Sequence, residues 1–163
     1  MADYGRIIGI ARRGERRAPM EKIRAGKISV AAGLDGDFKG TKHRKRQITI
    51  LAEEDWQAAL SDLPEDGASL PWTVRRANLL CHGLRLPRAK GAILKIGNVE
   101  LEVTGQTWPC KRMDEAFSGL LKALSQEWRG GVTCAVLHGG EVELGDTIEI
   151  VSAPEEIVRT LPG

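Results

Sequence analysis

The residue with the clearest chemical potential is Cys110, which lies in the segment TWPCKRMDEAF between Thr107 and Phe117. Residues 99–104 before it alternate apolar and polar side chains, a pattern that predicts a half-buried strand. The apolar residues after it recur at the spacing of one helix face, namely Met113, Ala116, Phe117, Leu120, Leu121 and Leu124. We therefore expect Cys110 between the end of a strand and the start of an amphipathic helix.

Cys110 in that position is suited to act as a reactive thiolate. Lys111 and Arg112 follow it directly, and two cations together with the positive end of a helix favour a thiolate over a thiol. The alternative is an ordinary loop cysteine. Cys81 and Cys134 lie in apolar segments, where a cysteine usually serves as a small hydrophobic side chain. Cys110 is therefore the candidate catalytic residue.

A glycine-rich loop, residues 33–47, is the first candidate for binding an anion. Among its cations are Lys42, Arg44 and Arg46. Such a loop can gather backbone N–H groups and cations around a negative charge. A charge run that only faces solvent is the alternative interpretation.

A second group of candidates lies outside this loop. Arg75 and Arg76 are adjacent, and Asn78 follows two residues later. The arginines could bind an anion, and the amide of Asn78 could form hydrogen bonds beside them. The alternatives are a surface pair beside an acidic loop and an asparagine that only closes a turn. Arg129, just before Gly130-Gly131, is one more candidate anion contact.

Many short elements must position these residues. Alternation and short apolar runs predict strands at 6–11, 20–23, 27–31, 48–51, 93–96, 99–104, 132–137 and 147–151. Residues 52–60 predict a short helix. Gly26 separates the second and third predicted strands, Gly97-Asn98 predicts a two-residue hairpin turn, and Gly139-Gly140 predicts another turn. The pattern favours a mainly β fold with added helices, either a barrel or a sandwich.

The composition is that of one globular domain. The chain has 163 residues and a net charge of +2, and we expect one domain at 1–151 followed by a loosely held tail at 152–163. It has no apolar run of about 18 residues and no signal-peptide pattern, so we expect no membrane segment and a cytoplasmic location. Its three cysteines lack CxxC spacing, which argues against a disulfide framework. A zinc set of Cys81, His82, Cys134 and His138 can be drawn, but its spacing matches no familiar pattern.

Four motifs, in order along the chain, resemble the MOSC family, which is named after the C-terminal domain of molybdenum cofactor sulfurase. They are GLDGD at 33–37, RRANLL at 75–80, IGNVELEVTGQTWPCKRMD at 96–114 and RGGVTCAVLHGGEVELGD at 129–146. The resemblance spans residues 5–151 and implies a MOSC-type β-barrel. The sequence contains no pyridoxal-phosphate sulfurase domain and no N-terminal β-barrel partner domain, so we expect a stand-alone member.

The resemblance also implies a role for Cys110. The family's cysteine falls on Cys110, and in the family it is proposed to carry sulfur as a persulfide or to bind the metal of a molybdenum–pterin cofactor. Such a cofactor needs a thiolate for its metal, cations for its phosphate and hydrogen-bonding groups for its pterin edge. The Arg-x-Asn pattern of cofactor-bound members matches Arg76 and Asn78. Pyridoxal phosphate would belong only to a separate sulfur-donor partner.

Three functions follow as hypotheses. The first is a molybdenum-cofactor-binding or sulfur-carrier protein that uses Cys110, with a cysteine desulfurase as a possible partner. The second is a small molybdenum-dependent reductase of N-hydroxylated compounds, which would need a separate electron-transfer partner. The third is a noncatalytic basic module that binds nucleic acid, which would need interleaved aromatics or a recognition helix. The run Lys39–Arg46 offers neither, so nucleic acid is not an expected partner.

Overall fold

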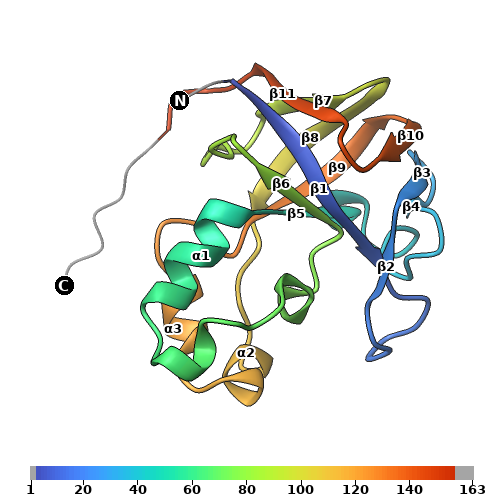
Figure 1. The fold of residues 1–163 in the computed structure, drawn as a ribbon. Coiled ribbons are helices and arrows are strands. Elements are labelled where there is room, and N and C mark those ends of the chain that lie inside the picture. The colour runs from blue at the N-terminus through green and yellow to red at the C-terminus, as the bar shows by residue number, and fades with distance from the viewer. Residues whose placement is uncertain (1–2, 157–163) are drawn as a thin grey trace.

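The structure is a computed structural model that describes residues 3–156 of the chain (Figure 1). Its strands are β1 Tyr4–Arg12, β2 Glu21–Ile23, β3 Ala25–Ser29, β4 Gly33–Leu34, β5 Ile48–Ala52, β6 Leu79–His82, β7 Ile93–Ile96, β8 Val99–Gln106, β9 Val132–His138, β10 Gly140–Glu143 and β11 Thr147–Ser152. Its α-helices are α1 Glu53–Ser61, α2 Arg112–Ala116 and α3 Leu120–Leu124, and its 3-10 helices are η1 Arg44–Arg46, η2 Glu65–Gly67 and η3 Trp72–Arg75. The predicted mainly β fold with added helices is confirmed.

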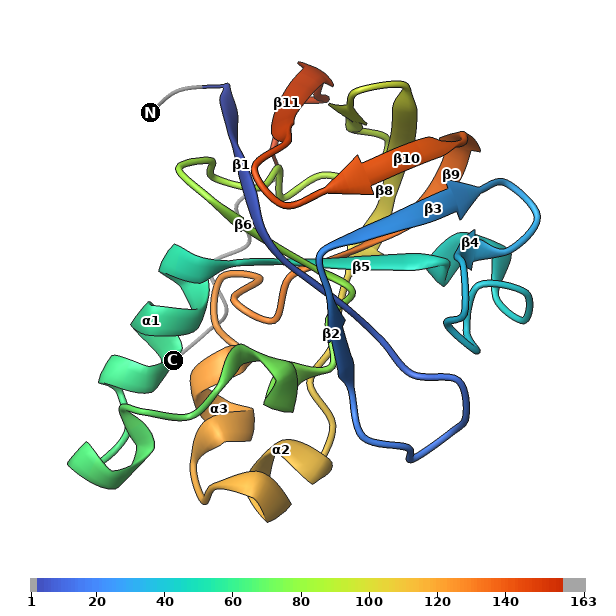
Figure 2. The same ribbon diagram turned by 45° about the vertical axis from the view of Figure 1, so that its right-hand side comes forward.

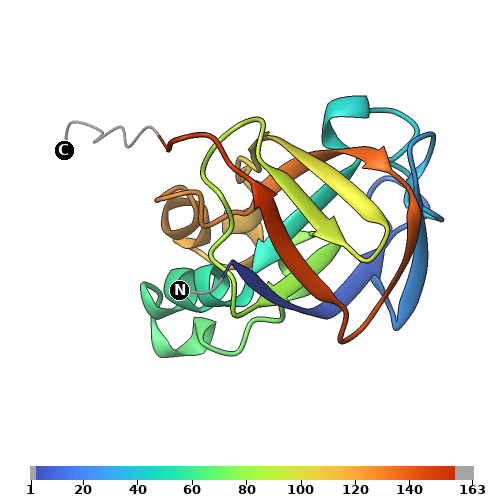
Figure 3. The ribbon, with the colours of Figure 1, turned by 90° about the horizontal axis from the view of Figure 1, so that it is seen from above.

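Seven of the strands close into a barrel. Their order is β11-β7-β8-β9-β5-β6-β1, and β1 pairs with β11 to complete the ring, which Figure 3 shows from above. β5 and β6 run parallel, whereas the other neighbouring strands of the ring are antiparallel. β2 continues the sheet beyond β1. The predicted barrel is therefore the correct choice over a sandwich.

The alternation of β8 shows why the barrel forms. Val99, Leu101 and Val103 are fully buried, whereas the residues between them are partly exposed. Because successive side chains of a strand point to opposite faces, one face of β8 fills the barrel and the other remains accessible. β7 pairs with β8 across Gly97-Asn98, as the sequence predicts, and Gly97 has the positive φ of 57° that this turn requires.

The helices cover one outer part of the barrel. Leu51 of β5 and Leu80 of β6 join a second apolar core with Trp56 of α1, Met113 of α2 and Leu120 of α3. Figures 1 and 2 show the three helices together on the same side of the barrel. None of the helices within residues 3–156 is long and apolar enough to cross a membrane.

Three local predictions are corrected. The single helix expected after Cys110 is divided into α2 and α3, because Phe117 is extended and Gly119 has a φ of +94°. Gly26 lies inside β3 rather than between two strands, and Gly140 begins the unpredicted strand β10, which pairs with β3 (Figure 2).

The boundary between the domain and a tail at 152–163 stays a prediction. Within that stretch, Glu156 accepts hydrogen bonds from Arg85 and Arg88, and residues 157–163 lie outside the described part.

Asn78 joins three strands where the chain enters β6. Its Oδ1 accepts the backbone N–H of Thr49 at 3.0 Å and the Thr49 hydroxyl at 3.2 Å. Its Nδ2 donates to the carbonyl of Ala11 at 3.3 Å, and the residue is 2% exposed. Asn78 therefore holds β5 and β1 beside the start of β6.

Replacing Asn78 with alanine should lower the free energy of unfolding by roughly 1–3 kcal/mol, because the buried Thr49 N–H would lose its acceptor. Urea denaturation measures the change. Asn98→Ala is the control, since Asn98 is exposed in the hairpin turn and its removal should change stability by no more than about 0.5 kcal/mol. Equal stability of the two variants would contradict this role of Asn78.

Candidate functional site

A pocket of about 600 Å³ opens beside Cys110. Its walls consist of Arg13, Arg16, Phe38, Lys39, Lys42, His43, Arg75, Arg76, Thr107, Trp108, Cys110, Arg112 and Met113. Seven of these residues are lysine or arginine, and none is a carboxylate. The pocket therefore combines an exposed thiol with a strong excess of positive charge.

The strand pairing explains why distant segments meet at this pocket. Cross-strand neighbours connect Gln106 to Val132, Val132 to Ile50, Ile50 to Leu79, and Leu79 to Ile10. The segments that adjoin this row carry the site. Residues 13–16 follow β1, residues 75–76 precede β6, and residues 107–110 follow β8.

Arg75 fixes the segment that leads to Cys110. Its Nη2 donates to the carbonyl of Thr107 at 2.8 Å, and its Nε donates to the carbonyl of Gly130 at 3.0 Å. The side chain is 6% exposed. Burial lowers the pKa of Arg75 to about 10, and the charge of a Cys110 thiolate acts in the opposite direction. Arg75 thus holds the segments at Thr107 and Gly130 together and also places a cation in the pocket of Cys110.

Arg13 is a second buried cation of the pocket. It is 6% exposed, and its guanidinium lies 4.8 Å from the centre of the Phe38 ring. Its Nη1 is buried and has no hydrogen-bond partner within the described chain. Burial lowers the pKa of Arg13 and the charge of Arg76 lowers it further, whereas Asp37 acts in the opposite direction. Arg13 therefore keeps an unused hydrogen-bond donor beside the pocket.

Lys39 and Lys42 complete the side of the pocket that the glycine-rich loop provides. Burial lowers the pKa of Lys39, and the positive charge of Arg13 lowers it further. Lys42 is exposed, and its Nζ lies 5.6 Å from the centre of the Phe38 ring. The interpretation of this loop as a purely solvated charge run is therefore incomplete, because two of its lysines line the pocket.

Cys110 and its neighbours form the open side of the site. Cys110 is exposed, and its carbonyl accepts the N–H of Met113 at 2.9 Å at the start of α2. Trp108 is 69% exposed, so its indole is open to a ligand. The hydroxyl of Thr107 is buried without a hydrogen-bond partner in the described chain. A planar ring could therefore stack on Trp108 while a polar group bonds Thr107.

The structure divides the residues that the sequence predicts for this site. Cys110, Arg75, Arg76 and Lys42 line the pocket together, but Arg44, Arg46, Asn78 and Arg129 do not. Arg44 and Arg46 lie in the exposed helix η1. The amide of Asn78 is engaged between the strands described above.

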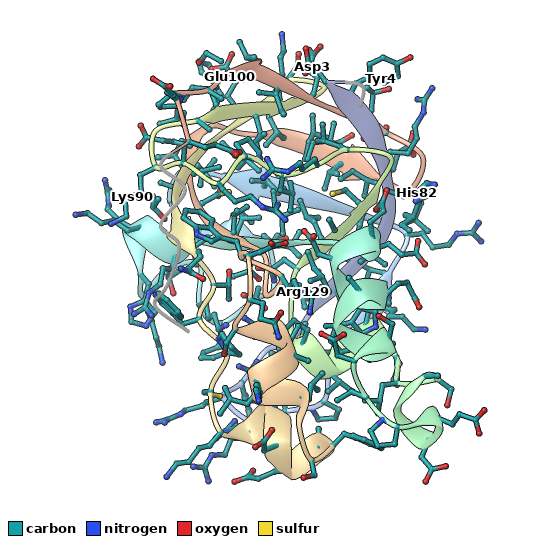
Figure 4. All side chains as sticks on the ribbon, turned by 90° about the vertical axis from the view of Figure 1, so that its left-hand side faces the viewer. Asp3, Tyr4, His82, Lys90, Glu100 and Arg129 are labelled. Atoms are coloured by element: carbon teal, nitrogen blue, oxygen red, sulfur yellow. The ribbon has the colours of Figure 1, made fainter. Side chains whose placement is uncertain are left out.

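Arg129 has other partners. Its Nη1 donates to Asp62 at 2.6 Å and to the carbonyl of Ala123 at 3.2 Å. Figure 4 labels it where the helices meet the barrel, far from Asp3, Tyr4 and Glu100 at the opposite end. Arg129 therefore connects α1 to the segment before β9.

Sequence reasoning missed Arg13 and Arg16 as residues of the site. Both lie in the basic connection after the first predicted strand, and that run of arginines was the available signal. No feature of the neighbouring sequence shows that this connection lies near Cys110, about a hundred residues later, because their proximity depends on strand pairing across the barrel. The zinc alternative is not supported, since no three metal-ligating side chains gather within residues 3–156.

Comparison with known proteins agrees with this architecture. The family model described as the MOSC domain matches residues 32–149. Similar solved structures include the YUAD protein from Bacillus subtilis, with 16% identity, a TM-score of 0.74 and coverage of 90% of this chain and 95% of that chain. YiiM from Escherichia coli has 18% identity and a TM-score of 0.70, and the match covers 93% of this chain and 72% of that chain. YiiM from Geobacillus stearothermophilus has 16% identity and a TM-score of 0.66, and the match covers 91% of this chain and 75% of that chain. At these identities the likeness is one of fold. A comparison with curated proteins found no match.

Iodoacetamide should alkylate Cys110 in the folded protein and leave Cys81 and Cys134 unmodified. Cys110 is exposed, whereas the other two thiols are fully buried. Burial also raises the pKa of Cys81 to about 12 and raises the pKa of Cys134 strongly, so few reactive thiolates form there. Peptide mass spectrometry before and after unfolding in urea measures the difference. Native labelling of Cys81 as fast as that of Cys110 would contradict the prediction.

Proposed function

Because this chain belongs to the MOSC domain family, we propose that it holds an anionic cargo at Cys110. The cargo is either sulfur, as a persulfide, or the molybdenum–pterin cofactor with the thiolate as a ligand of its metal. The observation that supports this proposal is the pocket around Cys110, in which seven cations and no carboxylate form the walls. Both cargoes are anions with soft sulfur chemistry.

The residues of the pocket fit the molybdenum–pterin cofactor. Arg76 and Lys42 would hold its phosphate, since both line the pocket and neither forms an ion pair within the described chain. Trp108 would stack on the pterin, and the Thr107 hydroxyl, which lacks a partner, would bond its polar edge. Cys110 would bind the metal as a soft thiolate. When bound, the molybdenum would supply redox chemistry.

The same pocket fits a persulfide. Cys110 is exposed to a separate sulfur donor, and the surrounding cations would stabilise the terminal anionic sulfur. Cys81 and Cys134 cannot take this role because both are completely buried. The proposal includes a cytoplasmic location, since a working free thiol remains reduced there.

Replacing Cys110 with serine should abolish molybdenum retention and persulfide labelling with little change in thermal stability. A serine hydroxyl is neither a soft ligand nor a sulfur acceptor, and residue 110 is exposed. Cys134→Ser is the matched control: it should keep the cargo but lose roughly 1–3 kcal/mol of stability, because its hydroxyl would be buried in the barrel.

The measurement combines a melting curve with elemental analysis for molybdenum and mass spectrometry for persulfide, after expression in a host that makes the cofactor. Cargo retained by Cys110→Ser, or lost by a folded Cys134→Ser, would show that the chemistry lies at another residue.

Replacing Arg76 with alanine should weaken binding of the pterin cofactor about tenfold at low salt, since a charged hydrogen bond to the phosphate would be lost. The difference from wild type should shrink as salt is added. Arg24→Ala removes the same charge from an exposed position outside the pocket and serves as the control. Fluorescence titration with the cofactor gives the affinities, and identical values for wild type and Arg76→Ala would remove this residue from the site.

A further inference from the structure

No carboxylate is among the described residues that line the Cys110 pocket. Burial lowers the pKa of Arg13, and the charges of Arg76, Arg112 and Arg16 lower it further. Three other guanidinium groups therefore repel the buried guanidinium of Arg13, although Asp37, which is outside the lining, offsets part of this effect. An anion inside the pocket would relieve the repulsion.

Two polar groups in the wall also lack a partner within the described residues. Nη1 of Arg13 is buried without a hydrogen bond, and so is Oγ1 of Thr107. A buried polar group of this kind usually has a ligand, an ion or a water as its partner. Arg13 is itself 6% exposed and lines the pocket, so an oxyanion in the pocket would give its guanidinium the partner that the described chain does not supply.

The nucleophile of the pocket is the exposed Cys110. The cations that would attract an anion and the thiol that could react with it therefore line the same pocket. A small oxyanion that carries a transferable sulfur atom satisfies both features. A neutral sulfur compound would make no use of the cations, and phosphate would make no use of the thiol.

Resting on the sulfur-carrier form of the proposed function, we infer that Cys110 is loaded by a small dianionic sulfur donor of the thiosulfate type. Arg13 and Arg76 hold the sulfonate oxygens of this donor. The donor is thus a free anion that enters the pocket, and no protein needs to carry sulfur to Cys110.

The transfer step balances without a further reactant. The Cys110 thiolate attacks the outer sulfur of thiosulfate, a bond forms between these two sulfur atoms, and the original sulfur–sulfur bond of the donor breaks. Its electron pair leaves with sulfite. One thiolate and one dianion become one persulfide anion and one sulfite dianion, and the oxidation of the cysteine sulfur is matched by reduction of the sulfur that leaves as sulfite. No proton and no external oxidant are consumed.

The test uses the reduced full chain and sodium thiosulfate. Wild type should release sulfite, and the Cys110 peptide should gain the mass of one sulfur atom after alkylation. Adding cyanide, which removes the persulfide sulfur as thiocyanate, should make the release continuous. Cys110→Ser should release no sulfite. The rate for wild type should fall as sodium chloride is added, because the pocket attracts its donor by charge.

Two variants test the oxyanion site. Arg76→Ala should slow sulfite release about tenfold, and Arg13→Lys should slow it by a similar factor, since lysine keeps the charge but loses the planar guanidinium. Arg24→Ala is the control with unchanged rate. Methyl methanethiosulfonate, a neutral reagent for thiols, should modify Cys110 equally fast in all three variants, which separates loss of the anion site from a displaced cysteine.

The outcomes distinguish this inference from the function on which it rests. No sulfite release, combined with persulfide formation from inorganic polysulfide or with bound molybdenum, would overturn the inference and leave the proposed function in place. If the protein forms no persulfide with any donor and also binds no molybdenum, both the inference and the proposed function are overturned. Equal rates of sulfite release in wild type, Arg13→Lys and Arg76→Ala would overturn the oxyanion site.

Discussion

The barrel depends on the pairing of its first strand with its last. Tyr4, Gly5 and Arg6 of β1 lie opposite Glu149, Ile148 and Thr147 of β11. These contacts join segments more than a hundred residues apart, so their loop-closure entropy is offset only when the rest of the sheet is present. The same pairing fixes β1, and the end of β1 delivers Arg13 to the Cys110 pocket. β6 and β2 pair with β1 nearer to Arg13, so all three neighbours of β1 help to place this wall of the pocket.

Burying the arginines of the pocket has a desolvation free energy that favourable interactions elsewhere in the fold must offset. Buried charges are unfavourable unless they are paired or hydrogen-bonded. Arg75 meets this requirement with two backbone carbonyls. The Arg13 guanidinium lies on the Phe38 ring, and the nearby carboxylate of Asp37 bonds the backbone N–H of Arg13. The two arginines therefore differ in role. Arg75 uses its guanidinium to hold two backbone segments together, whereas Nη1 of Arg13 has no hydrogen-bond partner in the described chain. A ligand that binds only the folded chain would add its binding free energy to stability.

Local patterns in the sequence predict the elements well, because alternation in β8, the Gly97-Asn98 turn and the acidic first turn of α1 are all properties of neighbouring residues. The break between α2 and α3 is harder to predict, since apolar spacing continues across Gly119 while the backbone does not. At the site, proximity in sequence is enough to single out Cys110 and Arg76, and both line the pocket. It does not reveal that Arg129 pairs with Asp62 or that Arg13 reaches the pocket, since both depend on contacts between distant segments.

The parallel pair of β5 and β6 has a consequence for how this barrel diversifies. Parallel neighbours require a long crossover connection, and here residues 53–78 provide it. This crossover contains α1, which supplies part of the outer core, and it ends with Arg75 and Arg76 at the pocket. Its middle portion contributes no strand to the ring. Exchange of the end of this crossover between relatives would reshape a wall of the pocket while the strand pairs of the barrel are preserved, so ligand preference and scaffold can evolve separately.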